Sequence, residues 1–284
     1  MNFTIALAQI DSAPGNLAEN VKKHVSMTEQ AAKQRAELIV FPELSLTGYS
    51  VKDMNRDIAF HVSKPPQLLS PLLELSHSIS IIIGGVEESS SFRFHNAAFL
   101  LEKGGVSCVH RKTYPPTYGM FDEMRYFSQG KAVRAFSSKV GTLGALICED
   151  LWHLPLPYLL AQEGAAVIIT LVASPTRISG DEHMLRIATA NAENHRAYAR
   201  LLSCYLVFCN RVGFEDGINF WGGSEVVGPD GTVLVSAKQF DEDLVFANID
   251  VREVRRARQL SRHFLDDDPD LVLRELRRLC MNPR

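Results

Sequence analysis

The sequence lacks the segments that would place it in a membrane or send it out of the cell. Its N-terminus, "MNFTIALAQIDSAPG", has no basic region and only a short apolar run, and no later apolar run reaches the length of a membrane span. Its five cysteines are an odd number without CxxC spacing, so neither a disulfide framework nor a zinc knuckle is expected. We expect a cytoplasmic protein that does not enter a membrane.

An excess of charge of one sign is also missing. The 284 residues carry a formal net charge of −3, with basic and acidic residues mixed along the chain. A one-sided basic surface is therefore not expected, which argues against nucleic acid or anionic lipid as a partner.

Common metal and nucleotide motifs are absent as well. The nine histidines form no HExxH motif or paired Cys/His spacing, which disfavours a zinc hydrolase. The glycines of "IIGGVEES" and "FWGGSEVVG" belong to neither a GxGxxG motif nor a P-loop, and we interpret them as turns. No metal site and no cofactor are expected.

The pattern of apolar residues predicts strands and helices that alternate in two similar halves. Strands are expected over 3–10, 36–43, 81–89, 140–148, 165–174 and 205–213, helices over 16–36, 65–80, 155–163 and 181–204, and hairpins over 96–112 and 223–237. This doubled order predicts an α/β protein with two mixed, six-stranded-type sheets in a four-layer α-β-β-α sandwich. No linker interrupts it, so we expect one domain over 1–284, with a core to about 255 and a charged, partly helical tail over 256–284.

Three reactive residues stand where predicted strands end, which is where ligands bind in open α/β sheets. Glu43 follows "LIVFP", Lys112 ends the first hairpin before the stiff loop "TYPPTYG", and Cys148 ends "ALIC". Alone, the cysteine would more often be inert core, the glutamate a cap or salt bridge, and the lysine a solvated charge. Together they predict a nucleophilic site, with Glu43 as base, Lys112 as stabilising cation and Cys148 as nucleophile. A helix directly after Cys148 would favour its thiolate.

The segments "FPE", "HRK" and "LICED" resemble, in this order and at these separations, the Glu-Lys-Cys triad of the nitrilase superfamily of carbon-nitrogen hydrolases. The resemblance covers nearly the whole chain and extends to the "GSEVVGPDG" hairpin. It implies hydrolysis of a non-peptide carbon-nitrogen bond through a thioester, and a homodimer or higher homo-oligomer to which the charged C-terminal helix contributes. A nitrile substrate is less expected, because nitrilases proper place Trp-Glu rather than Glu-Asp after the cysteine.

Within the superfamily, "KTYPPTYGMFDEMRYF" and "ICEDLW" resemble the glutamine amidotransferase domain of glutamine-dependent NAD synthetases. The resemblance implies that Glu123 is a second glutamate that holds the lysine, although a plain salt bridge with Arg125 is an alternative. It also implies that Tyr118 lines the substrate pocket and that Glu149 contacts a substrate amine, with its backbone N–H as an oxyanion donor. Ser174 and Tyr49 are further substrate-binding candidates. Trp152 is expected to pack in the core.

Two departures from those synthetases leave the substrate open. No SGGxDS synthetase motif is present, so a stand-alone amidase acting on a small amide is expected. Gly180 stands where the synthetases have an arginine for the α-carboxylate of glutamine, and Arg177 is a possible substitute. The alternative is a glutaminase-type subunit that passes ammonia to a separate synthetase.

Overall fold

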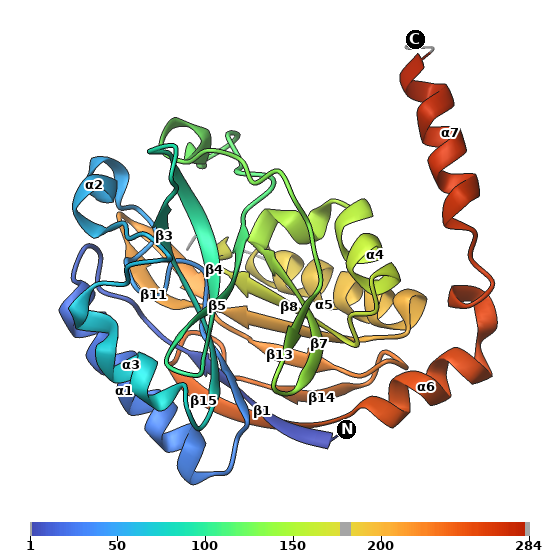
Figure 1. The fold of residues 1–284 in the computed structure, drawn as a ribbon, viewed down its shortest axis with the longest axis horizontal. Coiled ribbons are helices and arrows are strands. Elements are labelled where there is room, and N and C mark those ends of the chain that lie inside the picture. Colours follow the sequence, from blue (N-terminus) through green and yellow to red (C-terminus); the bar gives the residue numbers. More distant parts are fainter. Residues whose placement is uncertain (1, 177–182, 282–284) are drawn as a thin grey trace.

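The computed structural model describes residues 2–176 and 183–281, which form the predicted α-β-β-α sandwich (Figure 1). The first sheet has the strand order β15-β1-β2-β3-β4-β5, over Asp243–Asp250, Asn2–Gln9, Leu38–Val40, Ser80–Glu88, Phe94–Glu102 and Gly105–Arg111. The second has the order β14-β13-β10-β8-β7-β6, over Val233–Ser236, Glu225–Val227, Tyr205–Asn210, Val167–Val172, Gly141–Ile147 and Phe136–Ser138. The prediction of two mixed six-stranded sheets is thus confirmed.

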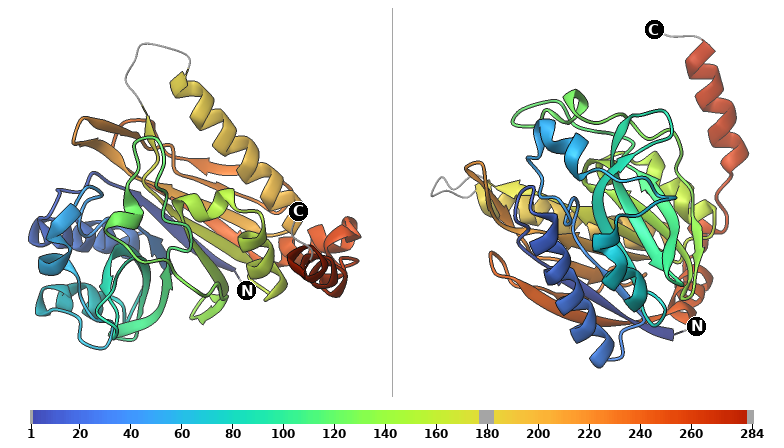
Figure 2. Two further views of the ribbon diagram at one scale, coloured as in Figure 1. Left: turned by 90° about the horizontal axis from the view of Figure 1, so that it is seen from above. Right: turned by 60° about the vertical axis from the view of Figure 1, so that its left-hand side comes forward.

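Helices cover the outer face of each sheet, as the views in Figures 1 and 2 show. The first sheet is covered by α1 and α3, and the second by α4 and α5, over Leu17–Lys33, Ser70–Leu75, Pro155–Gln162 and His183–Leu202. Asn16 caps α1 as predicted, because its side-chain oxygen accepts the Glu19 N–H at 3.2 Å. Short helical turns η1, α2, η2, η3, η4 and η5 lie at Lys52–Met54, Asn55–Ile58, Gln67–Leu69, Glu123–Arg125, Cys148–Trp152 and Arg262–Phe264.

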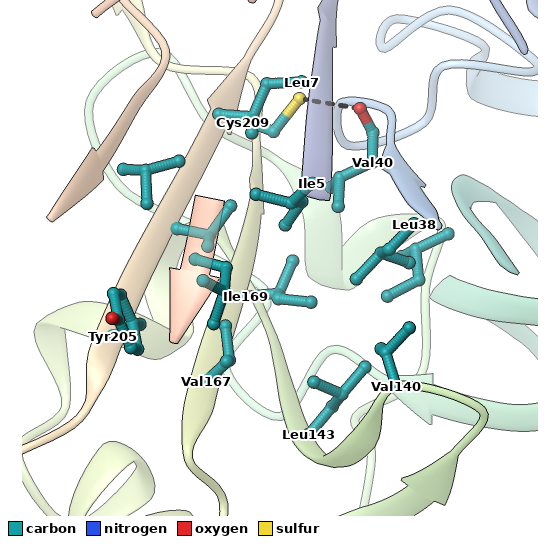
Figure 3. Close-up of a cluster of buried hydrophobic side chains, with 14 of the residues drawn as sticks. Ile5, Leu7, Leu38, Val40, Val140, Leu143, Val167, Ile169, Tyr205 and Cys209 are labelled. Carbon is teal, nitrogen blue, oxygen red and sulfur yellow. Dashed lines mark hydrogen bonds between the residues drawn. The ribbon is translucent and has the colours of Figure 1, made fainter. Parts of the chain in front are cut away.

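The main core fills the space between the sheets (Figure 3). Ile5 and Leu38 of the first sheet and Ile169 of the second are fully buried there. The thiol of Cys209 in β10 donates to the carbonyl oxygen of Val40 in β2 at 3.3 Å, which links the two sheets across this core. Burial in this apolar layer raises the pKa of Cys209, so the residue is a core thiol.

Several elements were not predicted. The strand β15 follows a polar loop yet pairs along all of β1, from Asn2 opposite Asp250 to Gln9 opposite Asp243. A separate three-stranded sheet has the order β11-β12-β9, over Val212–Glu215, Ile218–Trp221 and Pro175–Thr176. The strands of this sheet have two to four residues, so their pairing depends on contacts that sequence periodicity does not show.

The chain ends in two helices, α6 over Val251–Leu260, which begins within the predicted core region, and α7 over Pro269–Met281 in the predicted tail. Asp250 caps α6 by accepting the Arg252 N–H at 2.9 Å. Helix α7 projects from the sandwich, and none of its residues is buried (Figures 1 and 2). Among the described residues, no helix is long and apolar enough to cross a membrane.

The core contacts predict a large effect of truncating Ile169. Ile169→Ala should lower the free energy of unfolding by roughly 2–5 kcal/mol, because it leaves a cavity between the sheets. Urea denaturation followed by circular dichroism measures this change. Leu260→Ala, at a side chain that is 82% exposed, is the control and should change stability by less than about 0.5 kcal/mol. Equal effects of the two variants would contradict the assigned core.

Candidate active site

The reactive residues come from the ends of strands in both sheets. Glu43 lies three residues beyond β2, and Lys112 directly follows β5 of the same sheet. Cys148 directly follows β7 and Ala173 directly follows β8, both in the second sheet. The candidate site therefore lies at the seam between the sheets, where neither sheet alone could assemble it.

The loop that carries Glu43 packs tightly on the neighbouring strand. A Cβ atom at Gly84 in β3 would lie 2.5 Å from the Pro42 carbonyl oxygen and 2.4 Å from the Leu44 nitrogen. A side chain at position 84 would push this turn away, so a glycine is required there for the close approach of two backbones.

Lys112 is shared by two carboxylates. Its ammonium donates to Glu43 Oε1 and to Glu123 Oε1, each at 2.7 Å, and all three side chains are buried, with Lys112 only 1% exposed. Burial by itself would lower the pKa of Lys112, but the charges of Glu123 and Glu43 outweigh burial and raise it well above its ordinary value. The lysine is therefore a fixed positive charge.

Glu43 is held from three sides. In addition to Lys112, the side-chain amide of Asn96 donates to Oε1 at 2.8 Å, and the backbone N–H of Ala173 donates to Oε2 at 2.9 Å. The Ala173 contact crosses from the second sheet to the first. These three donors orient both oxygens of Glu43.

Glu123 is the titratable member of the group near neutral pH. Burial and the nearby Glu43 charge raise its pKa to about 7, against the opposing effect of Lys112. Its Oε1 also accepts the Tyr49 hydroxyl at 2.6 Å. Arg125 lies 3.9 Å from Asp122, and no salt bridge joins Arg125 to Glu123.

Cys148 opens the short helical turn η4 with a φ of +45°, an unusual conformation for a residue with a side chain. Burial raises its pKa well above the ordinary value, and the Glu43 charge raises it further, whereas Lys112 and a backbone hydrogen bond from Ala173 oppose the shift. The helix after Cys148 was expected to favour the thiolate, but its one short turn is outweighed by burial and the two carboxylates. A neutral thiol at rest needs a base to react.

Asp150 ties the loop after Lys112 to the turn at Cys148. It is fully buried and accepts the backbone N–H groups of Ile147, Thr113 and Tyr114 at 3.1, 2.9 and 2.9 Å. The His110 ring lies 3.0 Å from its second oxygen. One carboxylate thus positions the nucleophile and the lysine relative to each other.

A cavity of about 470 Å³ opens onto Cys148. Its lining is mostly apolar and includes Tyr118, Met120, Phe121, Glu149, Trp152, Ser174, Pro175, Thr176, Ile187 and Asn191. The Tyr118 hydroxyl donates to Glu149 Oε2 at 2.9 Å, and desolvation together with this carboxylate raises the pKa of Tyr118 to about 12. Among the described lining residues, Glu149 is the one carboxylate, and none is a lysine, arginine or histidine.

Ser174 is another residue that lines the cavity. Its hydroxyl accepts the indole N–H of Trp221 at 3.0 Å, and its backbone N–H donates to Asn210 Oδ1 at 2.9 Å. Two neighbouring elements, β10 and β12, therefore hold this residue in place.

The structure places the other predicted residues differently. Tyr49 contacts Glu123 and is not among the residues that line the cavity. Trp152, expected in the core, is instead 52% exposed and lines the cavity at the end of the turn that Cys148 opens. Arg177 and Gly180 lie outside the described residues.

Sequence reasoning missed Asn96, Asp150 and the Ala173 N–H. Asp150 had a signal in "CED", where a second carboxylate follows the nucleophile. Asn96 and Ala173 had none, because each meets Glu43 only through packing of distant strands. Among the described residues, no cluster of three or more His, Cys, Asp or Glu side chains has a geometry for a metal ion.

Known proteins resemble this chain in sequence and in fold. The sequence pattern of the carbon-nitrogen hydrolase family matches residues 4–259. A glutamine-dependent NAD(+) synthetase of Acinetobacter baylyi is 32% identical over 254 residues, which cover 89% of this chain and 45% of the synthetase, so the chain spans about half the length of that relative.

Solved structures of similar fold match nearly end to end. A carbon-nitrogen hydrolase of Helicobacter pylori G27 superposes with a TM-score of 0.85 and 25% identity, over 95% of this chain and 96% of that one. An amidase of Nesterenkonia sp. AN1 shares the fold, with a TM-score of 0.79 and 21% identity over 96% of each chain.

The charges around Cys148 predict how its reactivity will change when Glu43 is neutralised. Glu43→Gln should lower the thiol pKa and speed alkylation of Cys148 by iodoacetamide at pH 8, whereas Lys112→Met should slow it. Peptide mass spectrometry measures the rate, with the exposed Cys280 of the same chain as internal control. Slower alkylation in Glu43→Gln, with Cys280 unchanged, would contradict this balance of charges.

Proposed function

Because the chain belongs to the carbon-nitrogen hydrolase family, we propose that it is a cysteine-dependent amidase that releases ammonia from a small linear amide through a thioester. The observation that carries this proposal is that the hydrogen-bonded pair of Glu43 and Lys112 lies close enough to Cys148 to act on its charge, while Cys148 itself lines the cavity. The neutral thiol, the oriented carboxylate and the fixed ammonium match the needs of acyl transfer.

In the first half of the reaction, Cys148 Sγ attacks the amide carbonyl carbon while Glu43 takes the thiol proton. The negative charge that develops on the carbonyl oxygen is stabilised by Lys112 and by the backbone N–H of Glu149. The carbon-nitrogen bond then breaks, Glu43 returns its proton to the leaving nitrogen, and ammonia departs. An acyl group remains on Cys148 as a thioester.

In the second half, a water molecule attacks the thioester carbonyl. Glu43 takes a proton from this water, and the same two donors stabilise the second tetrahedral intermediate. The carbon-sulfur bond breaks, the carboxylic acid leaves and Cys148 recovers its proton. Glu123 keeps Lys112 in place through both halves, because it accepts a second hydrogen bond from the ammonium beside the one to Glu43.

The cavity favours an amide with an apolar body and an amine-bearing end. Its lining is mostly apolar, and the Glu149 carboxylate is positioned to accept from a substrate amine. Glutamine carries such an amine, but its carboxylate finds no cation among the described lining residues.

A second candidate function is an ammonia-donating glutaminase subunit that works with a separate NAD synthetase. The likeness to glutamine-dependent NAD(+) synthetases supports it, since this chain spans 45% of one such relative. The two candidates share the same chemistry at Cys148 and differ in whether ammonia leaves freely or passes to a partner enzyme.

Ammonia release should distinguish the two functions. Wild-type protein is incubated with glutamine, asparagine, simple amides, ω-amides and carbamoyl compounds, with and without an added NAD synthetase. The amidase proposal expects release from at least one compound by the protein alone, whereas release only with the partner favours the second candidate. No release under either condition, at high protein concentration, would contradict both.

The same assay should locate the catalytic charges. Cys148→Ala should abolish ammonia release, and Lys112→Ala should reduce it about a hundredfold to a thousandfold, because it removes a stabiliser of the oxyanion. Lys131→Ala, at an exposed lysine, is the matched control and should keep wild-type activity. A Lys112→Ala protein that is folded and fully active would overturn the assigned role of Lys112.

Activity should also fall as the pH drops through about 7. Glu123, with its pKa raised to about 7, is a carboxylate above that pH and becomes neutral below it, so Lys112 then loses one of its two anionic partners. A pH profile of kcat should show this acid limb, and Glu123→Gln should remove it while lowering the plateau. A wild-type profile that stays flat from pH 5 to 8 would argue against Glu123 as the controlling group.

A further inference from the structure

A buried ion pair behind the site reaches the catalytic centre through Tyr49. Glu215, the last residue of β11, accepts the backbone N–H groups of Tyr49, at 3.1 Å, and of Ser50. Its other contact is the guanidinium of Arg211, and both charged side chains are almost completely buried. A buried carboxylate is expensive to maintain, so its donors are held firmly in place.

Arg211 is itself anchored on several sides. It donates to Asp11 Oδ1 at 3.0 Å and to the Ser12 carbonyl oxygen at 3.3 Å, and its guanidinium lies 4.4 Å from the centre of the Phe220 ring. The Phe220 ring also packs against the Tyr49 ring in an edge-to-face arrangement, with 5.9 Å between the ring centres. Backbone and ring of Tyr49 are thus both fixed by the β11–β12 hairpin.

The hydroxyl of Tyr49 has one acceptor that matters for the site. It donates to Glu123 Oε1 at 2.6 Å, next to the Lys112 contact on the same oxygen. The other oxygen of Glu123 is buried and has no hydrogen-bond partner among the described residues. Two donors therefore orient this carboxylate, and Tyr49 is the uncharged one.

We propose that Glu215 is a positioning residue that acts through Tyr49 on Glu123. Its place in the sequence gives no hint of this, since it lies far from the catalytic motifs and does not line the cavity. The proposal rests on the proposed function for its effect on turnover, but not for its effect on the reactivity of Cys148.

The β11–β12 hairpin also contacts the substrate side of the site. Trp221, at the end of β12, donates to Ser174 on the cavity wall, and β12 pairs with β9 through Phe220 opposite Pro175. The same hairpin thus supports the Lys112 side of the site through Tyr49 and the substrate side through Ser174. Glu215 reaches the first side directly, because it accepts the backbone N–H groups of Tyr49 and Ser50.

The charged groups around the two carboxylates decide the direction of the effect. Glu123 faces Lys112, Tyr49, Glu43 and Cys148. Glu215 faces Arg211, with Lys52 at longer range. Losing the Tyr49 donor disfavours the ionised form of Glu123, so groups that depend on this ionisation should titrate at higher pH.

The test is a double-mutant cycle read by pH profiles. Tyr49→Phe, which keeps the ring contact with Phe220, should move the acid limb of kcat to higher pH by about one unit, as expected for loss of one hydrogen bond to a charged group. Glu215→Gln should move it in the same direction. The double variant should show no shift beyond that of Tyr49→Phe, because both changes remove the same contact.

A matched control lies next to Glu215. Asp216 occupies the same turn, is exposed, and pairs with Lys52 at 2.9 Å, so Asp216→Asn should leave the profile unchanged. If Glu215→Gln does not fold, Phe220→Leu takes its place, since it removes the ring contact without leaving an unpaired charge. The proposal would be overturned if the shifts of the two single variants add in the double variant. It would also be overturned if folded Tyr49→Phe has the same acid limb of kcat as wild type.

The pH dependence of Cys148 alkylation by iodoacetamide separates this proposal from the proposed function. Glu123 is among the charges that raise the thiol pKa, so Tyr49→Phe and Glu215→Gln should each change the alkylation profile of Cys148, non-additively, and leave Cys280 unchanged. These changes without any amide turnover by wild type would support the positioning role and contradict the amidase. Amide turnover by wild type, together with the same pH profile of Cys148 alkylation in all variants, would support the amidase and contradict the positioning role.

Discussion

The site depends on one buried cation that two carboxylates share. Lys112 is buried together with Glu43 and Glu123, and each carboxylate accepts a hydrogen bond from its ammonium, so the charge of Lys112 is compensated in the interior. Burial and the charges of Glu43 and Glu123 raise the pKa of Cys148, whereas Lys112 opposes the shift, and under the proposed function Glu43 is the group that takes the thiol proton. Stability of the group and reactivity of the cysteine are therefore set by the same three charges.

The distances between Lys112, its two carboxylates and Cys148 depend on how the two sheets pack against each other. Glu43 and Lys112 belong to the first sheet and Cys148 to the second, so their separation is decided by how the sheets pack on the core around Ile5, Leu38 and Ile169. Hydrogen bonds between the sheets and between the loops reinforce that spacing. The Ala173 N–H reaches Glu43 from the second sheet, and Asp150 collects backbone donors from both loops.

Three residues around the site each orient a different side chain of it through a hydrogen bond. Asn96 orients Glu43, Tyr49 orients Glu123, and Trp221 orients Ser174 on the cavity wall. The Glu149 carboxylate faces the cavity with Tyr118 beside it, which places acidic character where a substrate would lie and keeps it apart from the buried charges. The proposed function thus assigns chemistry and recognition to separate carboxylates.

The sequence alone predicts the sandwich and the position of the site, because strand periodicity and the placement of Glu43, Lys112 and Cys148 at strand ends are local properties. The doubled sandwich was predicted for that reason, and so was the nucleophilic site at the sheet ends. Packing over long sequence distances decided the rest. It gave Tyr49 a partner in Glu123, put Trp152 on the cavity wall, added β15 beside β1 and brought Glu215 behind the site. Such contacts join residues tens to hundreds of positions apart, and no periodicity in the chain records which distant side chain will fill a given space.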